Sequence, residues 1–204
     1  MIYKAPFLPY DKIRPYAQLF LEKYHPTKTV PIPIEGIIEF ELKMDIIPMP
    51  NLKTEFDVEG WLSNDFSSIY VDEWIQAERE NRYHFTLAHE VGHLILHEDF
   101  YKQAKFSNVN EWLDLQLSID SDQYSWFEKQ AYDFAGLILV PPEPLLEQYR
   151  KAVQILESQS YEFRKASIDI VNEYISVFAA KGFKVSDIVV NKRINYDNLT
   201  PNVV

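Results

Sequence analysis

The chain has 204 residues, of which 47% are hydrophobic and 25% charged, a composition typical of a globular protein with one core. The net charge of −11 disfavours direct binding of nucleic acid, and the lack of cysteine excludes disulfides and sulfur-ligated zinc. No apolar run approaches the roughly 18 residues of a membrane span, and residues 1–6 lack the apolar core of a signal peptide. We therefore expect a cytoplasmic protein without membrane contact.

The first quarter of the chain combines helical and strand-like segments. Apolar residues repeat at intervals of three and four over 11–24, which predicts an amphipathic helix that ends at His25. A second helix is expected at about 34–43. A short strand is expected at 45–47, next to Pro48.

Two strand-like runs follow, at 58–62 and 68–71. They are separated by Ser63-Asn64-Asp65, a turn signal that predicts a β-hairpin. We expect the strand of residues 68–71 to form the edge of a small twisted sheet.

The most informative segment, 86–96, contains His89, Glu90 and His93, the H-E-x-x-H pattern of zinc peptidases. Its apolar residues recur at helical spacing, and a helix would place both imidazoles on one face, where they could bind one ion. Glu90 would lie beside that ion, where it could take a proton from water. The alternative is a solvated helix face, but both histidines border an apolar stripe, where unpartnered polar rings are costly.

A catalytic zinc site has three protein ligands and an open position. His97 continues the four-residue spacing, but a helix rises about 12 Å over eight residues, so His89 and His97 would approach an ion from opposite ends. We expect His97 to be a capping residue or a residue that interacts with the helix dipole on the last turn, where a partial positive charge is favoured.

Glu128 is the better candidate for the third ligand, although a glutamate in this position, taken alone, is most often a surface residue. It lies in a segment, 126–140, whose apolar stripe predicts a second helix, ended by Pro141. Ala131 follows one turn later, and its small side chain would allow two helices to approach closely.

These segments resemble the ImmA/IrrE family of metallopeptidases. The family pattern contains an arginine followed by T-L-A-H-E-[LV]-G-H-L-x-L-H, then E-x-x-A-N-x-F-A-x-x-L-L-x-P. The chain has Arg82, TLAHEVGHLILH over 86–97 and EKQAYDFAGLILVP over 128–141. Weaker similarity in 31–40 and 60–72 extends the resemblance to about residues 10–150.

The resemblance implies one zinc ion per chain, with His89, His93 and Glu128 as ligands and Glu90 as the catalytic base. Manganese or iron could occupy the same ligands. The family usually has asparagine where this chain has Tyr132. Tyr132 or Asp133 could support a ligand histidine, and Tyr132 could also donate to the oxyanion of the reaction.

The rest of the chain is expected to be mostly helical. Segment 98–123 could form a wall or lid of the cleft, and a surface excursion is equally compatible. Helices are expected at 142–158 and at 161–180, the latter with Phe163 on its apolar face and ended by Gly182.

A short helix at 185–193, capped by Ser186, is expected to end the fold. The order of elements here, a helix, a glycine turn and a second helix with Lys192 and Arg193, superficially resembles a helix-turn-helix DNA-binding motif. The acidic charge of the chain favours a packing role instead.

The predicted fold is α+β and zincin-like: a small twisted sheet beside the helix with the H-E-x-x-H motif, surrounded by helices. We expect a metallopeptidase domain over 1–150, with a helical extension over 151–204 packed on it. An edge strand beside the active helix would bind substrate as an added strand, although a hairpin that only covers the core is equally compatible.

The favoured function is a zinc-dependent endopeptidase. The resemblance implies a protein substrate such as a repressor-type DNA-binding protein or an antitoxin-like partner, and the acidic charge would favour a basic partner. The alternative is an inactive metal-binding module that binds a regulatory partner. Glu90 favours catalysis, because a purely structural site does not need it. A DNA-binding regulator, the third possibility, is disfavoured by charge.

Overall fold

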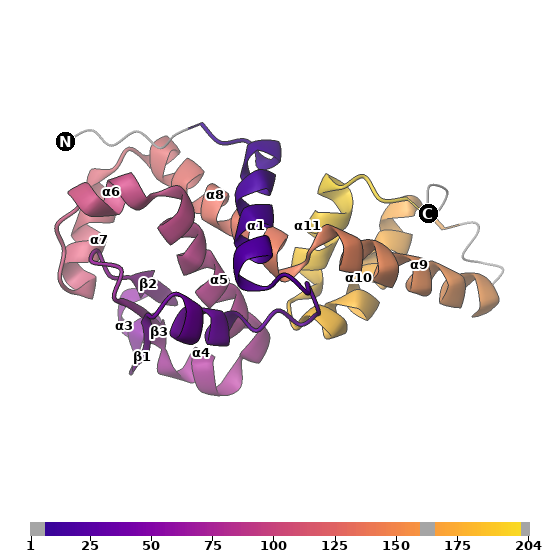
Figure 1. Ribbon diagram of the computed structural model, residues 1–204, viewed down its shortest axis with the longest axis horizontal. Helices are drawn as coiled ribbons and strands as arrows, with labels where there is room; N and C mark the ends of the chain where they lie inside the picture. The colour runs from indigo at the N-terminus through magenta and orange to yellow at the C-terminus, as the bar shows by residue number, and fades with distance from the viewer. Residues whose placement is uncertain (1–6, 160–165, 201–204) are drawn as a thin grey trace.

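A three-stranded mixed sheet packs beside a set of helices in the computed structural model, which describes residues 7–159 and 166–200 (Figure 1). This confirms the α+β fold. The strands are β1 (Asp45–Met49), β2 (Gly60–Leu62) and β3 (Ser68–Asp72). The helices are α1 (Tyr10–Tyr24), α2 (Ile34–Gly36), the π-helical turn η1 (Ile37–Glu41), α3 (Leu52–Phe56), α4 (Glu73–Glu78), α5 (Glu80–Leu96), α6 (Glu98–Gln103), α7 (Val109–Ser118), α8 (Ser121–Leu139), α9 (Pro142–Gln159), α10 (Ile168–Phe183) and α11 (Asp187–Tyr196).

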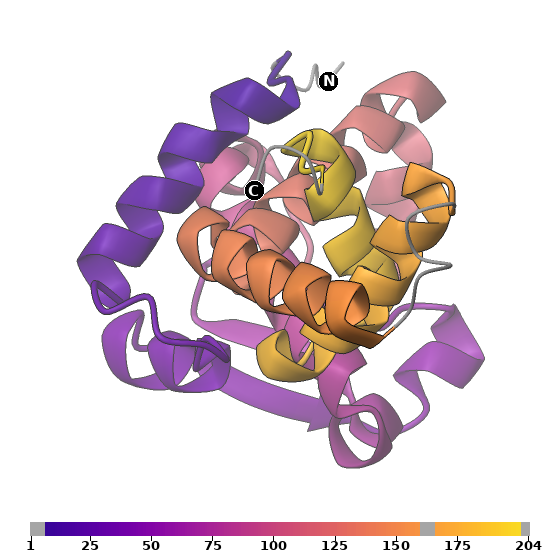
Figure 2. The ribbon, with the colours of Figure 1, turned by 90° about the vertical axis from the view of Figure 1, so that its right-hand side faces the viewer.

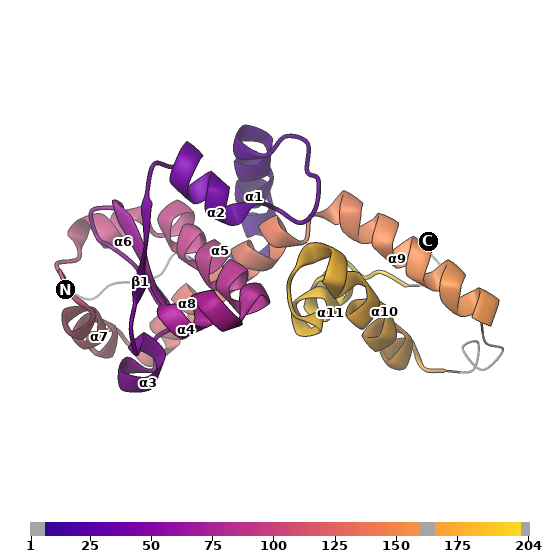
Figure 3. The same cartoon turned by 90° about the horizontal axis from the view of Figure 1, so that it is seen from below.

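The predicted hairpin is confirmed, but its second strand is not at the edge of the sheet. The strand order is β1-β3-β2, with β2 antiparallel and β1 parallel to β3. The central place suits β3, because four of its five residues are buried. Pro48 lies within β1, which is an edge strand and tolerates the missing N–H. The edge strand beside α5 is therefore β2, and the opposite edge of the sheet is β1 (Figure 3).

The helices α5 and α8 pack closely against each other and form the centre of the molecule. The sheet contacts α5, and α1 packs on α8 (Figure 1). Both central helices bury apolar residues at helical spacing, as their sequences predict. The core includes Leu87 and Val91 on α5 and Phe134 and Ile138 on α8, each 0% exposed.

The segment between these helices forms α6 and α7. Its aromatic residues turn inward: Phe100, Tyr101, Phe106 and Trp112 are buried, and Phe100 and Tyr101 contact Phe127 of α8. Segment 98–123 is polar overall, but its buried aromatic residues pack it against the helices α5 and α8.

The helices α9, α10 and α11 gather on one side of the molecule (Figure 2). Gly182 does not end α10 as expected. The helix continues to Phe183, and the next residue, Lys184, is its C-cap with a φ of 53°. Phe163 and residues 161–165 of the expected second helix lie outside the described residues.

Ser186 caps α11 as predicted, accepting a hydrogen bond from the Val189 N–H. Arg193 is only 2% exposed and contacts Asp197 and the Val140 carbonyl oxygen, while Lys192 lies over the Tyr132 ring. These contacts support the packing role of α11.

Among the described residues, no helix combines the length and apolar character needed to cross a membrane. The division at residue 150 stays a prediction.

Candidate metal centre

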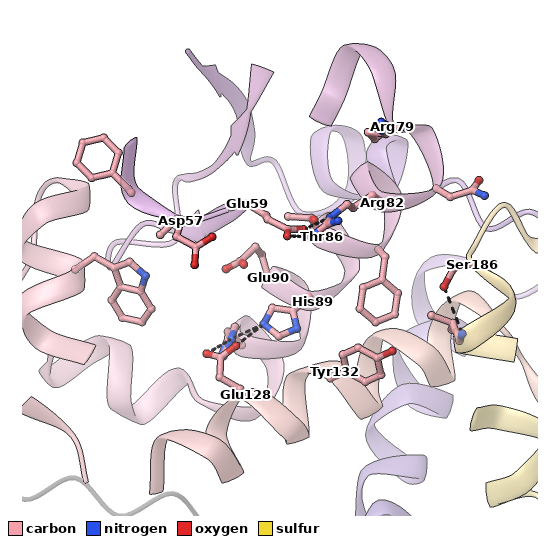
Figure 4. A pocket seen from close by; sticks show the side chains of 18 of the residues that line it. Asp57, Glu59, Arg79, Arg82, Thr86, His89, Glu90, Glu128, Tyr132 and Ser186 are labelled. Carbon is pink, nitrogen blue, oxygen red and sulfur yellow. Dashed lines mark hydrogen bonds and ion pairs between the residues drawn. The ribbon is translucent and has the colours of Figure 1, made fainter. Parts of the chain in front are cut away.

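His89, His93 and Glu128 come together where α5 faces α8 (Figure 4). The two histidines are one turn apart on α5, and their Nε2 atoms lie 3.0 Å apart. Glu128 reaches them from α8, with Oε2 3.1 Å from His89 Nε2 and Oε1 3.6 Å from His93 Nε2. The helix pair thus brings three potential donor groups to one point, as the motifs predict.

The spacing of these donors fits a metal ion. Tetrahedral zinc with bonds of about 2.0–2.1 Å requires neighbouring donors to be about 3.3 Å apart. The three separations in the cluster lie between 3.0 and 3.6 Å. His89, His93 and Glu128 therefore form a triad compatible with a single divalent ion.

Glu90 lies in the same cavity as the triad but is not part of it. Its side chain is 5% exposed, and burial raises the pKa of its carboxyl to about 7. The Leu62 N–H of β2 donates a hydrogen bond to this carboxylate. Glu90 is thus held between the active helix and the edge strand, with a proton affinity suited to a base at neutral pH.

The electrostatic environments of the two histidines differ. Burial, together with the proximity of His89 and His97, holds the pKa of His93 well below its usual value. Burial also opposes charge on His89, but the hydrogen bond and negative charge of Glu128 outweigh it and raise the His89 pKa. Burial and the neighbouring imidazoles thus keep His93 neutral, as metal binding requires, whereas His89 would release its proton when an ion binds.

A cavity of about 1140 Å³ surrounds the site. One side is formed by residues 56–60, which lead into the edge strand, and another by residues 78–82 around the start of α5. Trp112 of α7 and Ile188 of α11 line further walls. The structure therefore favours a cleft wall over a surface excursion for the middle segment.

Tyr132 and Asp133 do not reach the triad. The Tyr132 hydroxyl points away from His89 and Glu128, and its ring packs on Phe85 (Figure 4). Asp133 is buried and forms an ion pair with Lys129. The roles suggested for these residues from the sequence receive no support from this geometry.

Tyr124, which the sequence analysis did not select, lies beside the triad. Its hydroxyl forms a hydrogen bond with Glu128, and its side chain lines the cavity. Burial and the charge of Glu128 raise its pKa, so the phenol keeps its proton. Tyr124 precedes Glu128 by four residues on α8, and this helical spacing is the signal that could have identified it.

His97 ends α5 as expected but carries no charge there. It is 2% exposed, and burial lowers its pKa to about 4. His97 is thus the C-cap residue of α5, as expected, whereas desolvation outweighs the attraction of the helix dipole and disfavours the positive charge expected there.

Arg82, the arginine that precedes the motif, does not contact the triad. It forms hydrogen bonds through two nitrogens with the Glu59 carboxylate, and Lys53 also pairs with Glu59. Glu59 immediately precedes β2. The ion pair thus joins the start of the active helix to the edge strand.

Residues 69–195 match the family model Peptidase_M78, described as the IrrE N-terminal-like domain. The chain belongs to this family. The match spans well over half of the chain and includes the triad, Glu90 and the C-terminal helices through most of α11. Membership of this peptidase family agrees with the resemblance seen in the sequence. No curated protein matches the chain.

Proposed function

We propose that this protein is a metal-dependent endopeptidase that prefers zinc and uses Glu90 as its general base. The main support for this proposal is that the triad and the buried Glu90 line the same cavity. Two imidazoles and a carboxylate suit zinc, and they would also accept manganese or iron. The family's peptidase character supports the same reading.

When bound, the divalent ion supplies a Lewis acid that polarises the scissile carbonyl and makes an attacking water more acidic. His89, His93 and Glu128 would hold that ion. Glu90 accepts a proton from the water while the water oxygen bonds to the carbonyl carbon. Glu90 then passes that proton to the amine nitrogen as the C–N bond breaks. The Leu62 N–H holds the Glu90 carboxylate in place for both transfers.

The edge strand β2 offers a binding place for an extended substrate. Glu59 and Ser63 form hydrogen bonds toward β3, so the alternation of an antiparallel ladder turns the backbone groups of Gly60 and Leu62 to the opposite side. The Leu62 N–H donates to Glu90, whereas the backbone N–H and C=O groups of Gly60 can form main-chain hydrogen bonds with a peptide. This strand, rather than β3, is the proposed substrate platform.

We propose a protein substrate with a basic surface, such as a repressor-type DNA-binding protein or an antitoxin-like partner. The net charge of −11 supports attraction to such a partner. The same charge argues against direct nucleic-acid binding. A cytoplasmic location is part of this proposal.

The deciding experiment compares wild type with Glu90→Gln at equal metal loading. The DNA-binding proteins encoded beside the gene serve as substrates, and cleavage is followed by mass spectrometry. Glu90→Gln should bind metal normally and cut at least 100-fold more slowly, because the amide cannot take the proton. Glu55→Gln, at an exposed position on α3, is the matched control. Equal cleavage by Glu90→Gln would refute the mechanism, and metal binding without cleavage by either form would favour the inactive module.

A further inference from the structure

His97 is in contact with polar partners at both of its ring nitrogens. Its Nδ1 lies 3.0 Å from Nδ1 of His93, and its Nε2 lies 3.0 Å from Oε1 of Gln130. His97 and Gln130 are buried, at 2% and 0% exposure. Since the side chain of His97 is enclosed, these two hydrogen bonds determine where its proton is.

The positions of the protons follow from the chemistry of the three groups. A neutral imidazole has one nitrogen that donates and one that accepts. The amide oxygen of Gln130 only accepts, so Nε2 of His97 must donate to it. Nδ1 of His97 is then the acceptor, and the shared hydrogen belongs to Nδ1 of His93.

This arrangement leaves Nε2 of His93 with a free lone pair. That atom lies 3.0 Å from His89 Nε2 and 3.6 Å from Glu128 Oε1, so it faces the triad. A histidine ligand needs this tautomer, and the hydrogen bond at the other nitrogen usually selects it.

Aromatic packing restricts both rings as well. Phe127 stacks on His97 with ring centroids 4.1 Å apart and contacts His93 at 4.3 Å. Because Gln130 and Phe127 both come from α8, the helix that supplies Glu128 also orients His93 on the opposite helix.

We propose that His97, held by Gln130, is a positioning residue that fixes His93 in the tautomer whose Nε2 faces the metal centre. This inference rests on the proposed metal site. It assigns to a neutral histidine the task that a carboxylate or a backbone carbonyl usually performs beside a ligand histidine.

The test uses two replacements of nearly equal size, His97→Asn and His97→Leu. Asparagine can place an oxygen where histidine has Nδ1 and can accept from His93, whereas leucine cannot. Zinc affinity is measured by competition with a chromophoric chelator. His97→Leu should bind zinc about 10- to 100-fold more weakly than wild type. His97→Asn should stay within a few-fold of wild type. Equal losses in both variants, or no loss in His97→Leu, would overturn the proposal.

A second readout needs neither metal nor substrate. Long-range ¹H–¹⁵N spectra of the metal-free protein should show His93 protonated at Nδ1 in wild type and in His97→Asn, but a mixture of tautomers in His97→Leu. His93 protonated at Nε2 in wild type would contradict the inference. If His97→Leu does not fold, Gln130→Met, which removes the acceptor for His97, should show the same mixture, and Gln130→Glu should preserve the wild-type pattern.

These measurements separate the two proposals. A wild type that fails to bind zinc defeats the metal centre, and one that binds zinc but cuts nothing defeats the peptidase function. The tautomer of His93 is read independently of both.

Discussion

Gly92 on α5 lies directly against the backbone of Ala131 on α8. A Cβ atom built on Gly92 would be 2.9 Å from the Ala131 carbonyl oxygen and 3.0 Å from its Cα. The contact is next to His93 and one turn from Glu128, so it sets the distance between the two helices at the point where the donors meet. The geometry of the triad thus depends on the absence of a side chain at residue 92.

Gly92→Ala should therefore destabilise the protein and weaken metal binding. The added methyl group meets backbone that cannot rotate away, and such overpacking costs about 1–3 kcal/mol, more than the roughly 1 kcal/mol gained in helix propensity. Urea unfolding and zinc titration check both effects. Gly182→Ala is the control, because a Cβ there meets nothing within 4 Å and should be neutral or stabilising. Similar effects of the two substitutions would contradict the packing argument.

Removal of metal should lower the melting temperature of wild type but not of His93→Ala. An ion bound only by the folded state stabilises it by mass action, and about 3 kcal/mol is expected at 100 times the dissociation constant. Differential scanning fluorimetry with and without chelator measures this. His84→Ala, at a histidine outside the triad, should respond to the chelator like wild type. A chelator effect that persists in His93→Ala would place the ion elsewhere.

Titration of His97 should reduce the stability of the metal-free protein as the pH falls from about 6.5 to about 4. Burial lowers the pKa of His97 to about 4 in the folded state, whereas the unfolded residue titrates near 6.5. Between these values the unfolded chain binds the additional proton, so acid favours unfolding, by at most about 3 kcal/mol once pH 4 is reached. Urea unfolding across this range should give a shallower pH dependence for His97→Asn. Parallel curves for the two proteins would show that His97 does not titrate in this way.

Tyr124→Phe should slow cleavage about tenfold or more, while Tyr132→Phe should change it by less than threefold. The Tyr124 hydroxyl donates to Glu128, a residue that would hold the ion, whereas the Tyr132 hydroxyl points away from Glu128. The measurement is kcat and KM on the substrate found with wild type, with zinc occupancy determined for each variant. A larger effect at Tyr132 would restore the role expected from the sequence.

The triad could be predicted because its information is local. The spacing of His89 and His93 places them on one helical face, and the sequence around Glu128 resembles a family motif. Ala131 also indicated a close approach between two helices, which the Gly92 contact bears out. Periodicity and spacing were sufficient for the two histidines, whereas Glu128 was selected because its surroundings resemble the family motif.

Features that depend on tertiary contacts could not be predicted in this way. The central place of β3 depends on its pairing with β1, which strand propensity does not specify. The charge of His97 depends on burial beneath α8, and its position at a helix end suggested the opposite. Tyr132 looked suitable by its position in the motif, yet its hydroxyl turns outward. Gly182 was taken as a helix end, although Lys184 adopts the left-handed conformation.

The cavity wall contributed by α11 lies far along the chain from the reactive groups. Ile188 is 61% exposed and lines the cavity, but it follows Glu128 by 60 positions and contributes no donor to the triad. If the protein is a peptidase as proposed, substitutions at Ile188 would change the cavity wall while the triad and Glu90 on α5 and α8 stay intact. Under the proposed function, part of the surface that contacts substrate would thus be encoded well after the residues of the triad, and it could diverge while the triad stays the same.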